Sequence, residues 1–217
     1  MIKEIRFIVA FCIIFLVSCK EHVRNEVQVY ANNFESGDLS AIQSGAIAQF
    51  NNSAVLGRYN NGNFALTVNN LPEHDLITIS FDLYIHDKWD GNRMAPDGPD
   101  IWEMLVDGNT YINTTFSNDI CPGGGGVFCP PQAYPADYPN SNHNPKTGAF
   151  RTDLPGACSN SSSPNGTTEY KIEKTFRHTN KTLVLQCLDK LIQPNAADPK
   201  CDESWSVDNI VVKAITL

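Results

Sequence analysis

A strictly alternating segment at residues 76–85 constrains the fold of this chain more than any other feature. It reads LITISFDLYI, with large apolar residues at every second position from Ile77 to Ile85 and more polar residues between them. Successive side chains of a β-strand point to opposite faces of the sheet, so a period of two predicts a strand with one buried face. No stretch of useful length shows a period of 3.6 residues, which argues against a helical domain.

Other short runs rich in strand-forming residues surround this segment. Turn sequences such as Asn60–Asn63 and Asp107–Asn109 separate them. The further expected strands cover residues 46–50, 64–68, 101–106, 111–116, 169–178, 182–188 and 206–214. Many short strands joined by Gly- and Asn-rich turns are typical of a β-sandwich. We therefore expect an all-β fold over residues 30–217.

Residues 117–168 interrupt this pattern. They are rich in Gly, Pro, Asn and Ser and contain no clear strand. Loops of this length are uncommon in compact domains unless they serve a function or lack order. We predict one long loop insertion between two strands.

The charge balance limits the class of partner. The 217 residues contain 24 acidic and 16 basic side chains, which gives a formal net charge of -8. A protein that binds nucleic acid by neutralising phosphates needs a field of the opposite sign. We therefore expect no nucleic-acid partner, and the length fits one domain after removal of a leader.

The first residues have the form of an export signal. Lys3 and Arg6 precede an apolar run of eleven residues at positions 7–17. About 20 residues are needed to span a bilayer, so this run fits the core of a signal peptide instead. It ends in Leu-Val-Ser-Cys at residues 16–19, which resembles the lipobox of bacterial lipoproteins. A plain secretory signal with a chance cysteine is the alternative.

The lipobox resemblance implies where the protein resides. Residues 1–18 would be removed, Cys19 would carry the acyl chains, and residues 19–29 would form a polar tether to a membrane. Lys20-Glu21-His22 resembles the surface-export signal of Bacteroidetes lipoproteins, and a solvated tether facing the periplasm is the alternative. We expect a lipid-anchored protein of the bacterial cell envelope, at the outer membrane.

Five cysteines remain besides Cys19 in the mature chain. An oxidising envelope permits disulfides between them. We predict Cys187 with Cys201 and Cys121 with Cys129, which leaves Cys158 unpaired, although five cysteines allow several pairings. The absence of a C-x-x-C spacing argues against a zinc site.

Sequence blocks at the two ends resemble jelly-roll β-sandwich modules of the galactose-binding-like and carbohydrate-binding type. The blocks are Asn33-Phe34-Glu35 near the start and Asp-Asn-Ile-Val-Val at residues 208–212. The resemblance implies a jelly roll whose first and last strands lie side by side and share a Ca²⁺ ion. It assigns Glu35, Asp38 and Asp208 as ligands, since calcium prefers carboxylate oxygens. Turn capping by these acids is the alternative.

Three tryptophans occur within acidic blocks. An aromatic ring beside carboxylates and amides suits sugar recognition. Trp102 opens an expected strand and should lie in the core, whereas Trp89 lies in a loop and is the best candidate for an exposed platform. The candidate ligand-binding residues are Trp89, Asp90, Asn92, Asp100, Glu203 and Trp205. Core packing of the rings and Asx turns by the loop acids are the alternatives.

These observations predict a non-catalytic, calcium-stabilised module on the cell envelope that binds glycan or another surface ligand. A structural lipoprotein that docks a protein partner is one alternative. A glycan hydrolase is another, since the chain contains enough acids for two opposed carboxylates. No H-E-x-x-H or G-x-S-x-G motif occurs, and the glycines at 123–126 lack the Lys-Ser/Thr of a phosphate loop.

Overall fold

The computed structural model describes residues 25–118, 129–158, 161–193 and 196–217. The predicted signal peptide, the acylation site Cys19 and Cys121 lie outside this part of the chain. Within it, no helix has the length and apolar character that a bilayer crossing requires.

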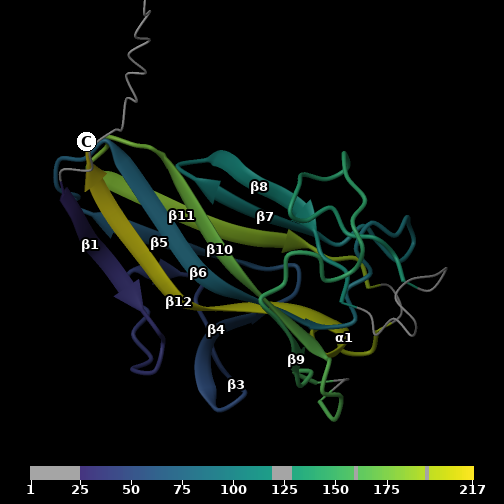
Figure 1. Cartoon of the computed structure of the whole chain (residues 1–217). Coiled ribbons are helices and arrows are strands. Elements are labelled where there is room, and N and C mark those ends of the chain that lie inside the picture. Colours follow the sequence, from purple (N-terminus) through teal and green to yellow (C-terminus); the bar gives the residue numbers. More distant parts are fainter. Residues whose placement is uncertain (1–24, 119–128, 159–160, 194–195) are drawn as a thin grey trace, which may run out of the picture.

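Twelve strands and one short helix make up the described chain (Figure 1). They are β1 (Asn25–Asn32), β2 (Ile42–Gln43), β3 (Ile47–Phe50), β4 (Ser53–Tyr59), β5 (Asn63–Asn69), β6 (Leu76–Asp87), β7 (Ile101–Val106), β8 (Asn109–Thr115), β9 (Arg151–Leu154), β10 (Thr167–Arg177), β11 (Thr182–Lys190), α1 (Pro199–Asp202) and β12 (Glu203–Thr216). The strands form two antiparallel sheets. One has the order β3-β4-β12-β6-β10-β9 with β1 added to β12, and the other has the order β2-β5-β11-β7-β8.

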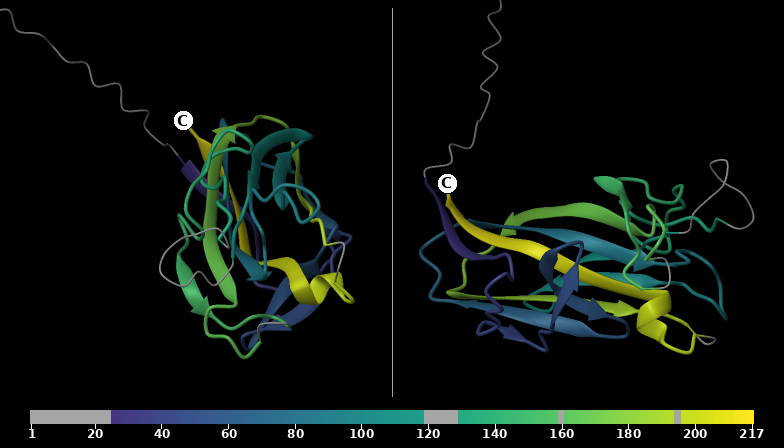
Figure 2. Two further views of the ribbon diagram at one scale, coloured as in Figure 1. Left: turned by 90° about the vertical axis from the view of Figure 1, so that its right-hand side faces the viewer. Right: turned by 90° about the horizontal axis from the view of Figure 1, so that it is seen from below.

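The two sheets pack face to face, so the predicted all-β jelly-roll β-sandwich is confirmed (Figure 2). The alternation along β6 places Ile77, Ile79, Phe81, Leu83 and Ile85 in the core, each 2% exposed or less. Complete burial of one such side chain contributes about 1.5–3 kcal/mol. The intervening residues of β6 point to the opposite face, which we call the outer face of the seven-stranded sheet.

The first and last strands lie side by side, as the family resemblance implied. β1 pairs antiparallel with β12 from Asn25 opposite Thr216 to Asn32 opposite Ile210. The start of β1 therefore lies next to the C-terminus (Figure 2). The predicted tether at 19–29 ends earlier than expected, because residues 25–29 belong to this strand. Their side chains are largely exposed, so hydrophobic periodicity gave no sign of it.

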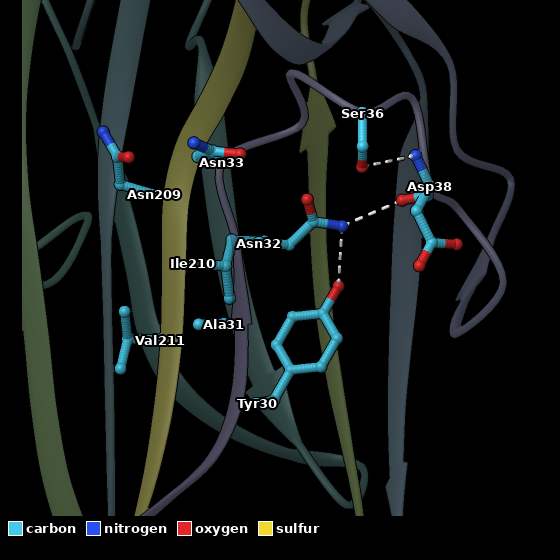
Figure 3. A pocket seen from close by; sticks show the side chains of 9 residues that line it. All are labelled: Tyr30, Ala31, Asn32, Asn33, Ser36, Asp38, Asn209, Ile210 and Val211. Atoms are coloured by element: carbon cyan, nitrogen blue, oxygen red, sulfur yellow. Dashed lines mark hydrogen bonds between the residues drawn. The ribbon is translucent and has the colours of Figure 1, made fainter.

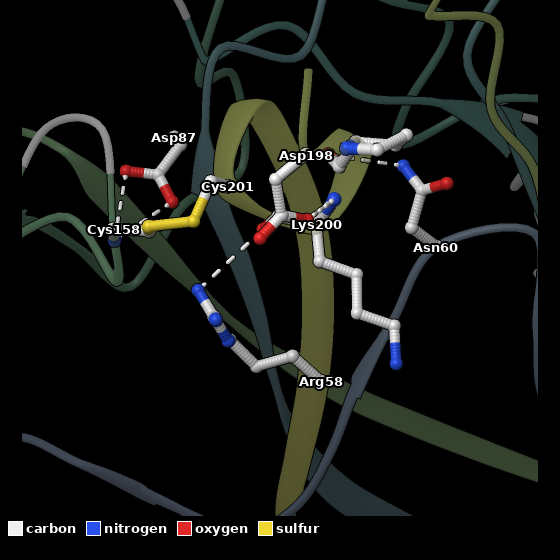
Figure 4. The surroundings of a disulfide bond; sticks show 8 residues. Arg58, Asn60, Asp87, Cys158, Asp198, Lys200 and Cys201 are labelled. Atoms are coloured by element: carbon white, nitrogen blue, oxygen red, sulfur yellow. Dashed lines mark hydrogen bonds between the residues drawn. A yellow bond between two sulfur atoms is a disulfide. The ribbon is translucent and has the colours of Figure 1, made fainter. Parts of the chain in front are cut away.

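The insertion connects β8 to β10, and it contributes β9 to the edge of the seven-stranded sheet beside β10. A disulfide between Cys158 and Cys201 joins it to α1 (Figure 4). The predicted Cys187–Cys201 bridge is wrong: Cys187 lies on β11 between Phe64 and Met104, and its thiol is free and buried in the core. Cys129 is disulfide-bonded, while its predicted partner Cys121 lies outside the described residues.

Candidate functional site

A bulge in β12 shapes the outer face of the seven-stranded sheet. The register against β6 shifts between Asp208 and Val211, and Asn209 adopts a left-handed backbone with φ of 52°. Asparagine tolerates this conformation better than most residues. The Asn209 side chain donates from Nδ2 to Asp82 Oδ2 at 2.8 Å. The bulge thus groups Asp82, Asp208 and Asn209 on the outer face, where the two aspartates are 7% and 4% exposed.

A groove of about 250 Å³ lies on the outer face beside this bulge. Tyr84 of β6, Glu169 of β10 and Asp208 of β12 form its floor, because the three strands are neighbours in the sheet. The β3–β4 hairpin and β9 rise at the two edges of the sheet (Figure 1). They contribute Phe50, Asn51, Ser53 and Val55 on one side and Arg151 and Leu154 on the other.

The groove combines an aromatic floor with charged groups of both signs. Lys171 Nζ lies 2.6 Å from Asp82 Oδ1 and 2.8 Å from Glu169 Oε1, which fixes both carboxylates in place. Burial raises the pKa of the Tyr84 hydroxyl, and the nearby carboxylates raise it further, so the hydroxyl stays protonated and can donate. Phe50 supports the Tyr84 ring at 5.4 Å between centroids.

A second, more open hollow of about 400 Å³ adjoins the groove on the other side of Asn209 (Figure 3). Asn32 donates from Nδ2 to the Tyr30 hydroxyl at 3.1 Å and to the Asp38 carbonyl at 2.8 Å. Asn209 lines both hollows, so they adjoin each other across β12.

The predicted calcium ligands are only partly brought together. Ser53 Oγ lies 2.7 Å from Glu35 Oε1 and 3.4 Å from Asp208 Oδ2, so a serine hydroxyl at the start of β4 lies between these two acids. Asp38 instead accepts from the Ser40 N–H at 2.8 Å, and its carboxylate points away from Asn209 (Figure 3). Within the described residues, no three His, Cys, Asp or Glu side chains are arranged to hold a metal ion.

The prediction of Trp89 as an exposed platform is wrong. Trp89 and Trp205 are both 0% exposed, so neither ring can stack on a ligand. The indole of Trp89 donates to the Ser204 carbonyl at 2.9 Å, and that of Trp205 to Asp189 Oδ2 at 2.6 Å. Trp102 lies in the core, as expected. A position in a loop segment does not expose the ring of Trp89, because its indole bonds the start of β12 at the end of the sandwich.

The remaining predicted ligand-binding residues also lie beneath the surface of the loop end. Asp90, Asp100 and Glu203 are 8%, 0% and 0% exposed. Asn92 bonds the insertion, donating from Nδ2 to the Ser141 carbonyl at 2.8 Å. With three of the four side chains buried, these residues do not form an open binding site.

Apart from Asp208, which was predicted as a calcium ligand, sequence reasoning missed the residues of the groove. Tyr84 and Asp82 occupy outward positions of the alternating segment. The alternation identifies which residues share a face of the sheet, but it does not indicate that the face binds a ligand. Glu169 and Arg151 become neighbours of Tyr84 only through the pairing of β10 with β6 and β9. No local pattern marks that pairing.

Comparisons with known proteins identify no family for this chain. No protein-family model matches the chain, and no curated protein matches it. Among solved structures, it is similar to a family 35 carbohydrate-binding module from Clostridium thermocellum, with 11% identity, coverage of 87% of this chain and 97% of that one, and a TM-score of 0.36. The C-terminal family 6 carbohydrate-binding module of the laminarinase LamC from Zobellia galactanivorans gives 10% identity, coverage of 87% and 98%, and a TM-score of 0.36. Latent PorU from Porphyromonas gingivalis gives 7% identity, coverage of 91% and 14%, and a TM-score of 0.44. The solved structures that this chain resembles therefore include carbohydrate-binding modules built as β-sandwiches, at a similarity too low to carry a ligand over.

Proposed function

We propose that the groove on the outer face of the seven-stranded sheet binds a glycan. The observation that carries the proposal is a half-buried tyrosine on the groove floor beside a carboxylate on each side, with an arginine at the rim. Sugars present apolar C–H faces and many hydroxyls, which suit an aromatic ring flanked by charged acceptors and donors. The volume of the groove suits a short segment of a glycan chain.

A lipid anchor at Cys19 is part of this proposal. β1 begins at Asn25, six positions after that cysteine, so a tether would hold the sandwich close to a membrane. The groove lies along β12 at Asp208, away from the strand ends Asn25 and Thr216 that would face the anchor. This orientation leaves the groove open to a ligand outside the membrane.

We further propose that Glu35 and Asp208 share a calcium ion beside the groove. Burial raises the pKa of Asp208 to about 6, and the carboxylates of Asp82 and Glu35 add to the shift, so the site carries negative charge that a cation would relieve. Calcium should raise the Tm of the wild type, and the shift should shrink in a Glu35→Gln, Asp208→Asn double variant. An unchanged shift in that variant would contradict the assignment.

Glycan hydrolysis in the same groove is a second candidate function. Asp208, with its raised pKa of about 6, faces a groove that also contains Glu169, which is held by Lys171. A carboxyl group with a raised pKa near an ionised carboxylate is the arrangement that glycosidases use. Release of new reducing ends, lost in Asp208→Asn, would establish it, and binding without release would exclude it.

A glycan array followed by calorimetry on the hits tests the binding proposal. We expect Tyr84→Ala to weaken binding about fivefold or more, since an aromatic contact contributes roughly 1 kcal/mol or more beyond its buried area. Glu169→Gln should weaken it through lost hydrogen bonds to hydroxyls.

Tyr111→Ala serves as the matched control, because Tyr111 is a half-buried tyrosine on β8 of the other sheet and contacts Phe176 at 4.5 Å. It should leave affinity unchanged. Equal binding by the wild type and Tyr84→Ala would show that the glycan does not use this groove.

A further inference from the structure

An exposed phenylalanine lies at the edge of the seven-stranded sheet, beside the groove. Phe150 immediately precedes β9 and is 62% exposed, and among the large apolar side chains exposed in the described ranges it is the aromatic one. Its backbone N–H donates to the Glu169 carbonyl at 2.8 Å, which holds the residue against β10. Phe150 therefore presents an aromatic ring to solvent next to Arg151 and Glu169, which both line the groove.

The ring of Phe150 is held by the same lysine that joins two carboxylates at the groove. Lys171 Nζ lies over the ring, 4.8 Å from its centroid, which is within the range of a cation–π contact. The same Nζ bonds Asp82 and Glu169, so one charged group links the phenylalanine ring to the outer face of the sheet. Lys171 occupies one face of the ring, and the large exposed fraction of Phe150 leaves the other face open to a ligand.

Phe150 and Tyr84 both adjoin the outer face, two strands apart. Tyr84 of β6 is opposite Glu169 of β10, and Glu169 is opposite Arg151 of β9, the residue that follows Phe150. Neighbouring strands are about 4.8 Å apart, so the strands that carry the two rings are separated by roughly 10 Å. One sugar ring cannot contact both aromatic side chains, whereas a chain of sugars that crosses the strands can.

The charges around the two rings favour a ligand without negative charge. Lys171 is paired with two carboxylates, and Arg151 is paired with Asp153 at 3.0 Å. Asp208 adds a further carboxylate to the groove, so acidic side chains outnumber basic ones here. A polyanionic chain would be repelled by this field, whereas the hydroxyls of an uncharged chain can donate to the carboxylates.

We propose that the glycan site extends from Tyr84 to Phe150 and takes an uncharged oligosaccharide chain that crosses β6, β10 and β9. Phe150 stacks on a sugar ring at the outer end of this chain, and Tyr84 stacks on one inside the groove. Glu169 lies between them and accepts from sugar hydroxyls. This inference rests on the proposed glycan-binding function and deepens it, because it assigns the charge, the minimum length and the direction of the ligand.

Oligosaccharides of increasing length test the proposal on the full-chain protein. Immobilised xylan, laminarin and galactomannan serve as neutral probes, and heparin and polygalacturonate serve as anionic ones. We expect binding to a neutral probe, and an affinity that rises from the disaccharide to the hexasaccharide of that polysaccharide. Phe150→Ala should weaken hexasaccharide binding about fivefold or more through the loss of one aromatic contact. It should leave the affinity for the disaccharide, which Tyr84 holds in the groove, unchanged.

Further variants separate stacking from other effects of the substitution. Phe150→Trp keeps an aromatic face and should retain the hexasaccharide affinity of the wild type, whereas Phe150→Leu lacks a flat ring and should resemble Phe150→Ala. Met94→Ala is the matched control, because Met94 is an apolar side chain that is 84% exposed and lies outside the groove. It should leave all affinities unchanged. The variants should all keep the Tm of the wild type, since both side chains are exposed.

The outcomes distinguish this inference from the function on which it rests. Equal hexasaccharide affinity for the wild type and Phe150→Ala, with binding weakened in Tyr84→Ala, would overturn the extension to Phe150 and leave the proposed function standing. Preferential binding of heparin or polygalacturonate would overturn the assignment of an uncharged ligand. No binding of any probe by the wild type would overturn both proposals.

Discussion

His86 shows how one buried side chain couples the stability of this sandwich to pH. It is 0% exposed on β6, and its ring nitrogens lie 2.7 Å from Ser206 Oγ and 3.0 Å from Thr167 Oγ1. Burial lowers its pKa to about 3, and the positive charge of Arg58 contributes to the shift. The folded protein therefore keeps this imidazole neutral under conditions in which the unfolded chain protonates it.

We expect His86 to make the protein less stable as the pH falls. The contribution of the neutral imidazole to the free energy of unfolding is fully present above about pH 6.5, the pKa of histidine in the unfolded chain. As the pH falls from that value to about 3, this contribution is lost at roughly 1 kcal/mol for each pH unit. Urea unfolding at pH 7, 6 and 5 measures this loss. The free energy of unfolding of His86→Gln should fall less over the same pH range, because the variant lacks this imidazole. The other titrating groups remain in both proteins and contribute equally. Identical pH profiles for the two proteins would contradict this expectation.

At the scale of elements, the insertion is held by specific bonds despite its loop-like sequence. Gln132 is 0% exposed, and its Nε2 donates to the carbonyls of Tyr134 at 3.1 Å and Thr147 at 3.0 Å. Its Oε1 accepts from the Lys146 N–H at 2.9 Å. Gln132 Oε1 also accepts from the hydroxyl of Tyr170 on β10 at 3.3 Å, and this bond and the Cys158–Cys201 bridge attach the insertion to the sandwich.

Removing the Cys158–Cys201 bridge should weaken the protein measurably. The bridge spans 43 residues, and closing a loop of that size contributes about 2–4 kcal/mol by restricting the unfolded chain. Urea unfolding of Cys158→Ser, Cys201→Ser should show that loss. Cys187→Ser is the control for disulfide pairing: it should leave the linked peptides of residues 158 and 201 intact in a mass-spectrometric map. Linked peptides of Cys187 and Cys201 in the wild type would contradict the structure.

At the scale of the whole molecule, β1 closes an edge that would otherwise be open. β4 pairs with β12 only over residues 205–207, whereas β1 pairs with residues 210–216 on the same side of the sheet. Without β1, the last seven residues of β12 that it covers would present unpaired backbone groups along one edge. Exposed edge strands of this kind recruit other chains.

A chain that begins at Asn33 should therefore be less stable and should associate, while a chain that begins at Asn25 should remain monomeric. Light scattering during size-exclusion chromatography and thermal melts measure both effects. A monomeric Asn33 chain with an unchanged Tm would show that β1 contributes little to the closure of this edge.

The sequence by itself determined the features that depend on neighbouring residues. The alternation from Ile77 to Ile85 identified β6 and its buried face, because successive side chains of a strand point in opposite directions whatever lies beyond it. The turn at Asp107–Asn109 likewise marked a hairpin correctly. Glu35 and Asp208 both contact the Ser53 hydroxyl, and a calcium ion shared between them stays a prediction.

Only the tertiary structure decided which distant residues become neighbours. The burial of Trp89, the pairing of Cys158 with Cys201 and the groove around Tyr84 all depend on the order of strands and on how the insertion folds back. Residues separated by tens of positions meet only when burial and backbone pairing are satisfied across the whole molecule. That balance is a property of the complete fold, so no local pattern of residues could have specified it.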